Sequence, residues 1–265
     1  MRSRSGTTLV ELLAGMAVGS LVVVAAIGGQ LHLRRIAEGI VVRGQGERRG
    51  SELIAVVEAV GRQLRHARVV GDTALEAELR IGVGVTCRAD TSGLRLTPSD
   101  PSDADALTVL AEVPANGDRL DYLASPDTAR GPEWISVQVR EALMMTGRDA
   151  CGDGSPFVGA SSRFDAAARL TFAQPAPVPP PGAPVELYRR IRLVTYQEAG
   201  GAWMVGLRNC AGMRCGAAQP IGGPVRPPRE GGLAFHAAAD GYLTAIARIP
   251  AVDRPFSGII VVGRP

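Results

Sequence analysis

The chain has 265 residues, of which 29 are basic and 26 acidic, and 46% are hydrophobic. This composition excludes a wholly disordered chain and suffices for one principal folded unit with a sizeable core. All the basic residues are arginines, and in the sequence they form no long cluster. The nearly balanced charge therefore gives no electrostatic case for direct binding of nucleic acid.

The most apolar part of the chain comes first. Residues 12–33 contain no charged side chain, and as a helix they would extend for about 33 Å, enough to cross a hydrocarbon core of about 30 Å. We therefore expect a transmembrane helix over residues 7–33. A secretory signal peptide is the alternative, with 26–28 as a small-residue cleavage site. Glu11, a carboxylate at the edge of the apolar run, has no use in an ordinary signal peptide or anchor.

The run from Gly6 to Leu13, Gly-Thr-Thr-Leu-Val-Glu-Leu-Leu, closely resembles the class III leader of type IV pilins and type II secretion pseudopilins. The resemblance implies that residues 1–6 are a leader, and that a prepilin peptidase cuts between Gly6 and Thr7 and methylates the new amine of Thr7. It also implies that Glu11, at the fifth mature position, serves in subunit assembly. Thr7 departs from the usual Phe or Met, a variation that minor pilins tolerate better than major ones.

Orientation follows from the same resemblance, because arginines flank the apolar run on both sides and the positive-inside rule does not decide it. The family places the leader in the cytoplasm and the bulk of the chain in the periplasm. This implies a single-pass protein of the inner membrane with a periplasmic C-terminal domain. The subunit would later enter a pilus or pseudopilus fibre.

A second helical segment is expected over residues 34–70. Its apolar stripe has helical spacing, with charged residues on the other faces, and consists of Leu53, Val56, Val57, Val60 and Leu64. Glycines before this stripe predict a bend or a melted stretch, at Gly39, Gly44, Gly46 and Gly50. Residues 48–70 are similar to the end of the first helix in minor pilins of the W type, where that helix packs against a β-sheet.

From residue 71 to 265 short β-like segments replace the helical pattern. The best strand candidates are residues 120–123, 134–139, 170–172, 187–196, 203–207, 233–235, 242–249 and 259–262. The clearest hairpin spans 188–207 and turns at 198–202. Proline-rich residues 174–184 and 220–228 are expected to be exposed loops. With the helix, these segments predict an α+β, pilin-like fold: a long membrane-spanning helix packed on a C-terminal antiparallel β-sheet domain.

Four cysteines lie in this β-rich part, and their even number suits an oxidising compartment. Four cysteines allow three connectivities. We favour a bridge from Cys210 to Cys215, because the glycine-containing loop between them brings the sulfurs together. Cys87 would then pair with Cys151. A four-cysteine zinc site is disfavoured, because the spacing has no CxxC pairs.

Signals for catalysis are scarce. The histidines His32, His66 and His236 are scattered and have no spacing suited to a metal. Ser155 and Ser161 do not complete a nucleophile elbow. Aspartates in the loop at 100–105 lack the glycine and distal glutamate of a calcium-binding EF-hand. We therefore expect no enzyme activity, no metal and no cofactor.

These features together predict a minor pilin of the W type, which co-assembles with other minor pilins and the major pilin to initiate or cap a type IV pilus. Its other partners would be the prepilin peptidase and the inner membrane. A J-type minor pseudopilin of a type II secretion system shares the leader and the β-rich bulk, and remains an alternative. A tethered periplasmic enzyme and a surface adhesin are the alternatives from other functional classes.

Overall fold

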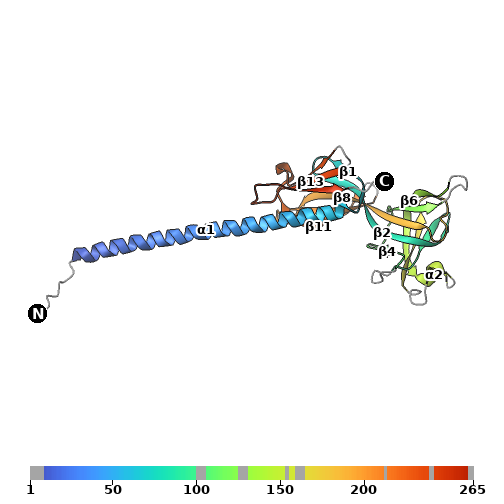
Figure 1. Cartoon of the computed structure of the whole chain (residues 1–265), viewed down its shortest axis with the longest axis horizontal. Helices are drawn as coiled ribbons and strands as arrows, with labels where there is room; N and C mark the ends of the chain where they lie inside the picture. The colour runs from blue at the N-terminus through green and yellow to red at the C-terminus, as the bar shows by residue number, and fades with distance from the viewer. Residues whose placement is uncertain are drawn as a thin grey trace.

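A computed structural model describes residues 9–99, 106–124, 131–152, 155–158, 165–211, 214–238 and 242–261; the side chains of residues 9–29 and 32 lie outside the description. The chain begins with one long helix, α1 (Leu9–Gly61). The strands that follow form a body around the C-terminal end of α1, and the rest of the helix extends away from this body (Figure 1).

The strands pair antiparallel throughout. Their bounds are β1 (Leu64–Val70), β2 (Ala74–Asp90), β3 (Gly93–Leu96), β4 (Val109–Leu110), β5 (Arg119–Ala124), β6 (Glu133–Thr146), β7 (Ala166–Phe172), β8 (Pro184–Gln197), β9 (Trp203–Ala211), β10 (Arg214–Cys215), β11 (Gln219–Val225), β12 (Leu233–Ala237), β13 (Tyr242–Ala247) and β14 (Phe256–Val261). Two short helical turns complete the fold, α2 (Gly147–Cys151) and η2 (Pro228–Glu230).

Eleven strands belong to one sheet, and six of them close into a ring in the order β2-β3-β7-β6-β5-β8, with β8 paired back to β2. Ring closure leaves these strands no free edge along the paired stretches. The remaining strands, β12, β13 and β14, form a separate sheet beside α1. In Figure 1 the ring lies at the end of the body remote from the free part of α1.

Two hydrophobic cores result. The helix-side core packs α1 residues such as Leu53 and Val57 against the first half of β2, the second half of β8, β9 and the three-stranded sheet. The distal core fills the ring of strands, with Tyr122 and Phe172 stacked at its centre, their ring centroids 5.8 Å apart.

β2 and β8 run through both cores. Leu75 of β2 and Leu193 of β8 belong to the helix-side core, whereas Ile81 and Leu187 belong to the distal one. The register between the two strands shifts at Arg80–Gly82. A bulge of this kind bends a strand and changes its twist, so the bulge is placed where the pair passes from one core to the other.

The predicted α+β class is wrong, because strands make up 52% of the structure and helix only 19%. The fold is β-rich. The reason lies in the stretch from residue 62 onward: the apolar stripe of the helix ends, and Leu64 begins β1, which pairs with β2 instead of continuing as helix to residue 70.

The predicted membrane span is also corrected. Of the helices in the described part of the chain, none combines the length and apolar character needed to cross a membrane. The transmembrane helix expected over residues 7–33, and with it the single-pass inner-membrane position with a periplasmic domain, is therefore overturned. Beyond the expected span, the described side chains of α1 include exposed charges on successive turns, among them Arg34, Arg35 and Glu38, which would be costly inside a bilayer. The side chains of residues 7–29 lie outside the description.

The glycines do not interrupt α1, which is continuous from Leu9 to Gly61. Two of the four lie where the body meets the helix: a side chain at Gly46 would meet Val252, and one at Gly50 would meet the ring of Phe256. Close packing of the body thus uses these glycines, and it offsets their low helix propensity. Gly39 and Gly44 have open space around them.

All eight predicted strands overlap observed ones, although β13 ends at Ala247 instead of residue 249 and residue 262 lies outside the description. The 188–207 hairpin forms with Gln197 opposite Trp203. The 174–184 run connects β7 to β8 as expected. The other proline-rich segment differs from the prediction, because Pro220 and Pro224 belong to β11. That strand pairs only with β9, and an edge strand tolerates residues that cannot donate a backbone hydrogen bond.

Candidate functional site

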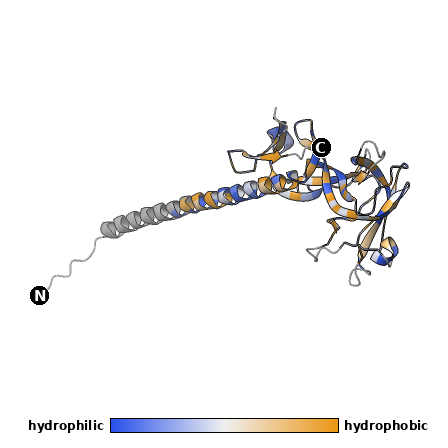
Figure 2. Cartoon of the chain, turned by 45° about the vertical axis from the view of Figure 1, so that its right-hand side comes forward, coloured by the Kyte–Doolittle hydropathy of each residue, from blue (hydrophilic) through white to orange (hydrophobic). Residues whose placement is uncertain are grey.

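The free part of α1 is the most distinctive surface of the molecule. Every described residue from 30 to 45 is exposed, and contact with the body begins at Gly46. The exposed residues include large apolar side chains, with Leu33 at 67% and Ile40 at 66% of full exposure. Figure 2 shows these hydrophobic positions interspersed with hydrophilic ones along the free helix.

The apolar side chains are arranged as a ridge. Leu33, Ile36 and Ile40 follow one another at three- and four-residue spacing, which places them on one face of the helix. Ile36 and Ile40 border a shallow hollow of about 430 Å³ that also involves Gly39, Arg43 and Gly44. The glycines leave space in which a side chain of a neighbouring helix would fit. We call Leu33, Ile36 and Ile40 the helix ridge.

Charged residues stabilise the same helix without covering the ridge. Arg34 pairs with Glu38 at 3.1 Å, and Arg48 pairs with Glu52 at 2.8 Å, both at four-residue spacing. The hydrogen bond from Arg48 to Glu52 raises the pKa of the arginine. Exposed pairs of this kind are weak, so they support the helix rather than determine where it docks.

The body holds the other end of α1 firmly. Leu53 and Val57 are almost fully buried, and Glu58 accepts a hydrogen bond of 3.1 Å from the backbone N–H of Ile259 in β14. Arg254 reaches Glu47 at 3.6 Å from the loop before β14. The helix thus forms an arm: one end is fixed in the helix-side core, and the ridge is presented to solvent.

The residues that the leader motif singled out lie outside the described part. Gly6 and Thr7 precede the first described residue, and Glu11 falls within α1 but its side chain is not described. The predicted cleavage at Gly6–Thr7, methylation of Thr7 and assembly role of Glu11 therefore stay predictions.

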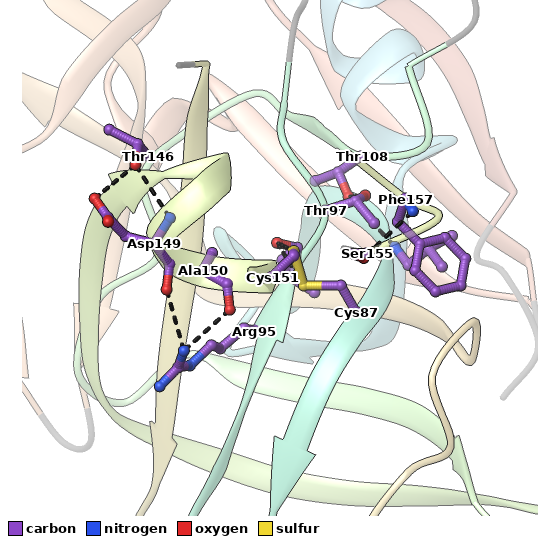
Figure 3. Close-up of a disulfide and its surroundings, with 12 residues drawn as sticks. Cys87, Arg95, Thr97, Thr108, Thr146, Asp149, Ala150, Cys151, Ser155 and Phe157 are labelled. Carbon is purple, nitrogen blue, oxygen red and sulfur yellow. Dashed lines mark hydrogen bonds between the residues drawn. A yellow bond between two sulfur atoms is a disulfide. The ribbon is translucent and has the colours of Figure 1, made fainter. Parts of the chain in front are cut away.

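The cysteines form the two disulfides that we favoured, Cys87–Cys151 and Cys210–Cys215. The first joins β2 to the helical turn α2 (Figure 3). Beside it, Arg95 donates to the carbonyl oxygens of Asp149 and Ala150 at 3.1 and 3.0 Å, which ties α2 to β3. The second bridge closes the short β9–β10 hairpin.

The two histidines with described side chains, His66 and His236, lie in different sheets, and the side chain of His32 in α1 is not described. His66, in β1, has its Nε2 atom 3.9 Å from Glu78, and His236 lies on β12 without any cluster of metal-binding groups. In the described residues no three histidine, cysteine or carboxylate side chains are grouped to hold a metal. The aspartates at 100, 103 and 105 and Ser161 lie outside the description.

Sequence reasoning missed the helix ridge. Its signal is present, because apolar residues recur at helical spacing between residues 33 and 40 among charged ones. The expected boundary between the membrane helix at 7–33 and the second helical segment at 34–70 divides this pattern. Only the structure shows that the body leaves the stretch uncovered.

Comparison with known proteins adds no relative: no protein-family model, no curated protein and no solved structure matches this chain.

Proposed function

We propose that the protein is a minor pilin of the W type, which co-assembles with other minor pilins to initiate or cap a type IV pilus. The observation that carries the proposal is the helix ridge: a helical arm whose apolar side chains at Leu33, Ile36 and Ile40 are exposed. The leader-like run at Gly6–Leu13 supports it independently. The proposed role is assembly, without turnover of a substrate.

In this proposal the arm packs against the helices of neighbouring subunits. An exposed Ile or Leu that becomes fully buried contributes about 1.5–3 kcal/mol, and three such side chains lie on the ridge. Part of this gain offsets the loss of translational and rotational freedom on association. Multiple neighbours in a fibre would share that cost.

In this proposal, N-terminal processing sets how neighbouring arms are aligned along their axes. Cleavage after Gly6 would leave a charged amine at Thr7, at the positive end of the helix, four residues from Glu11. The Glu11 carboxylate would pair with the Thr7 amine of a neighbouring subunit, since an unpaired carboxylate among apolar helices is costly.

Processing is tested by the intact mass and N-terminal sequence of the protein from cells with active prepilin peptidase. We expect a chain that begins at Thr7, and a Gly6→Val variant that keeps its leader. A mature chain that begins at Met1, or beyond the apolar segment, would refute the proposal.

Assembly is tested by co-purification with the other minor pilins. Ile40→Gln keeps helix propensity but removes the apolar side chain, so we expect it to reduce the recovered complex strongly. Ile259→Gln is the matched control, because Ile259 is a similarly exposed isoleucine on β14, in the body and not on the free part of α1. We expect Glu11→Ala to be cleaved normally and to assemble poorly. Equal recovery from the two isoleucine variants would contradict a role for the ridge, and recovery with type II secretion pseudopilins instead would assign the chain to the J type.

A further inference from the structure

The sheet formed by β1, β2, β8 and β9 has two different faces. Odd-numbered residues of β2 and β8, such as Leu75 and Leu193, point into the helix-side core. The opposite face carries charged side chains, which the register places side by side: Arg65, Arg68, Arg80, Arg190, Arg192 and Arg208. Arg119 of β5 adjoins them opposite Tyr188. We call these seven residues the arginine face.

Four carboxylates share this surface and neutralise part of it. Arg65 pairs with Asp121 at 2.9 Å and reaches Glu186 at 3.5 Å. Arg119 pairs with Glu78 at 3.2 Å. Glu76 receives three arginines, Arg68 at 2.6 Å, Arg190 at 3.1 Å and Arg192 at 3.8 Å. Among the residues that the structure describes, seven guanidinium groups thus face four carboxylates, which leaves an excess of positive charge.

The excess is concentrated at particular arginines. Arg192 and Arg208 are directly opposite one another in the β8–β9 register, an arrangement of like charges that is unfavourable across a strand pair. The Nε atoms of both are buried and have no hydrogen-bond partner. Within the described part of the chain, neither Arg208 nor Arg80 has a carboxylate at ion-pair distance. An anion at this face would relieve both the repulsion and the unpaired charge.

Two adjoining hollows on this face offer space for such a ligand. One, of about 330 Å³, is bordered by Arg119, Ser136 and Gln138; the other, of about 370 Å³, is bordered by His66 and Arg68. Glu78 and Arg190 border both hollows, so the two form one elongated depression.

The backbone at its edge is unusual. His66 has a φ of 48°, in the left-handed region, at the bulge between Arg65 and Arg68. Non-glycine residues rarely adopt this region, because it is sterically unfavourable for them. The bulge places the exposed imidazole over the depression instead of continuing the strand's alternation.

We propose that the arginine face binds an extended acidic peptide segment of a partner protein. Arginine forks hold the partner's carboxylates bidentately, while Ser136 and Gln138 hydrogen-bond to its backbone or polar side chains. Glu76 and Glu78, interleaved with the arginines, match a ligand that also carries N–H donors. This binding does not depend on the helix ridge or on the proposed role in pilus assembly.

The same features disfavour nucleic acid. Single strands bind on exposed aromatic rings, but the ring on this face, Tyr188, is only 3% exposed and donates to Glu186. A nucleic acid is therefore an outcome that the experiment must be able to detect.

The test measures the fluorescence anisotropy of a labelled oligo-glutamate peptide on titration with the purified full chain. We expect saturable binding that weakens as salt is raised, and no binding of an oligo-lysine peptide. The double variant Arg80→Gln with Arg208→Gln removes the two arginines without a carboxylate partner, and we expect it to weaken binding about tenfold.

Arg229→Gln is the matched control, since it removes one exposed arginine on η2, outside the face. It should leave the affinity within about twofold of the wild type. Arg80→Gln alone and Arg229→Gln remove the same charge, so equal losses in these two single variants would overturn the proposal, because binding would then follow net charge alone. Tighter, competing binding of a single-stranded DNA oligonucleotide would also overturn it.

Unchanged thermal melting of the variants verifies that they fold. If the double variant melts early, Arg80→Gln alone replaces it, because this side chain is exposed. The expected loss of affinity is then about threefold.

Discussion

The helix-side core and the distal core share the strands β2 and β8, yet different elements enclose them. The helix-side core is covered by α1 and by β12–β14, which come from opposite ends of the chain. The distal core is enclosed by its own ring of strands and is stapled by the Cys87–Cys151 disulfide. One region is thus completed by distant segments, whereas the other closes on itself.

Arg189 marks the boundary between the two cores. On β8 it lies between Leu187 of the distal core and Ile191 of the helix-side core. Its guanidinium holds Asp118 bidentately, at 3.0 and 2.8 Å, and it also donates to Glu112 and to the carbonyl oxygen of Val113. The hydrogen bond with Asp118 raises the pKa of Arg189. Two cores can share one strand because this buried, fully partnered charge separates them.

The strongest way to break the arrangement is Arg189→Met. This change leaves the carboxylate of Asp118 buried without its charged partner, since only the backbone N–H of Ala115 among the described groups still donates to it, so we expect the free energy of unfolding to fall by about 3–5 kcal/mol. Urea denaturation measures the loss. Arg190→Met, one residue along and on the exposed face, should cost no more than about 1 kcal/mol. Similar losses at the two positions would show that the boundary has no special role.

The two disulfides, one in each region, should differ in how much they stabilise the protein. The chain-entropy relation gives about 4 kcal/mol for the Cys87–Cys151 bridge, which spans 64 residues, and about 2 kcal/mol for Cys210–Cys215, which spans five. We therefore expect the double Cys→Ala variant of the first pair to melt well below that of the second. Hydrogen exchange should report the loss mainly in β3, β6 and β7. Faster exchange confined to α1 and β14 would contradict a self-contained distal region.

Helix docking gives a smaller, local effect. An alanine at Gly50 meets the ring of Phe256, whereas one at Gly39 meets nothing within 4 Å. Both changes gain the same helix propensity, but Gly50→Ala also overpacks the contact with β14. We expect the two variants to differ in unfolding free energy by about 1–3 kcal/mol, with Gly39→Ala the more stable. A difference near zero would mean that the body adjusts freely around the helix.

The smallest effect concerns pH. The hydrogen bond from Arg68 is the largest influence that lowers the pKa of Glu76 below its ordinary value of 4.5. The stabilisation is therefore present above pH 4.5 and is lost as pH falls through the lowered pKa. The stability advantage of the wild type over Glu76→Gln should shrink as pH falls below about 4.5. Arg68→Gln should remove the same pH dependence, and an unchanged slope in either variant would argue against this pair.

Much of the local structure was predictable from short windows of sequence. The alternating apolar residues of β8, the glycine turn at 200–201 and the five-residue spacing of the second cysteine pair each act over a few residues, and each prediction agrees with the structure. The long strand β2 was missed. Its glycines at 82 and 84 weaken the strand pattern, yet they allow β4 and Thr108 to pack closely against it.

The sequence by itself determined the strand segments, the hairpin and the presence of a long N-terminal helix, because hydrophobic period and turn chemistry are encoded locally. The tertiary structure alone decided how β2 pairs with β8, about a hundred residues away, and hence which side chains share a face. This pairing gathers arginines that are scattered in the sequence and leaves the helix ridge uncovered. Such outcomes depend on non-local packing, which no local pattern specifies.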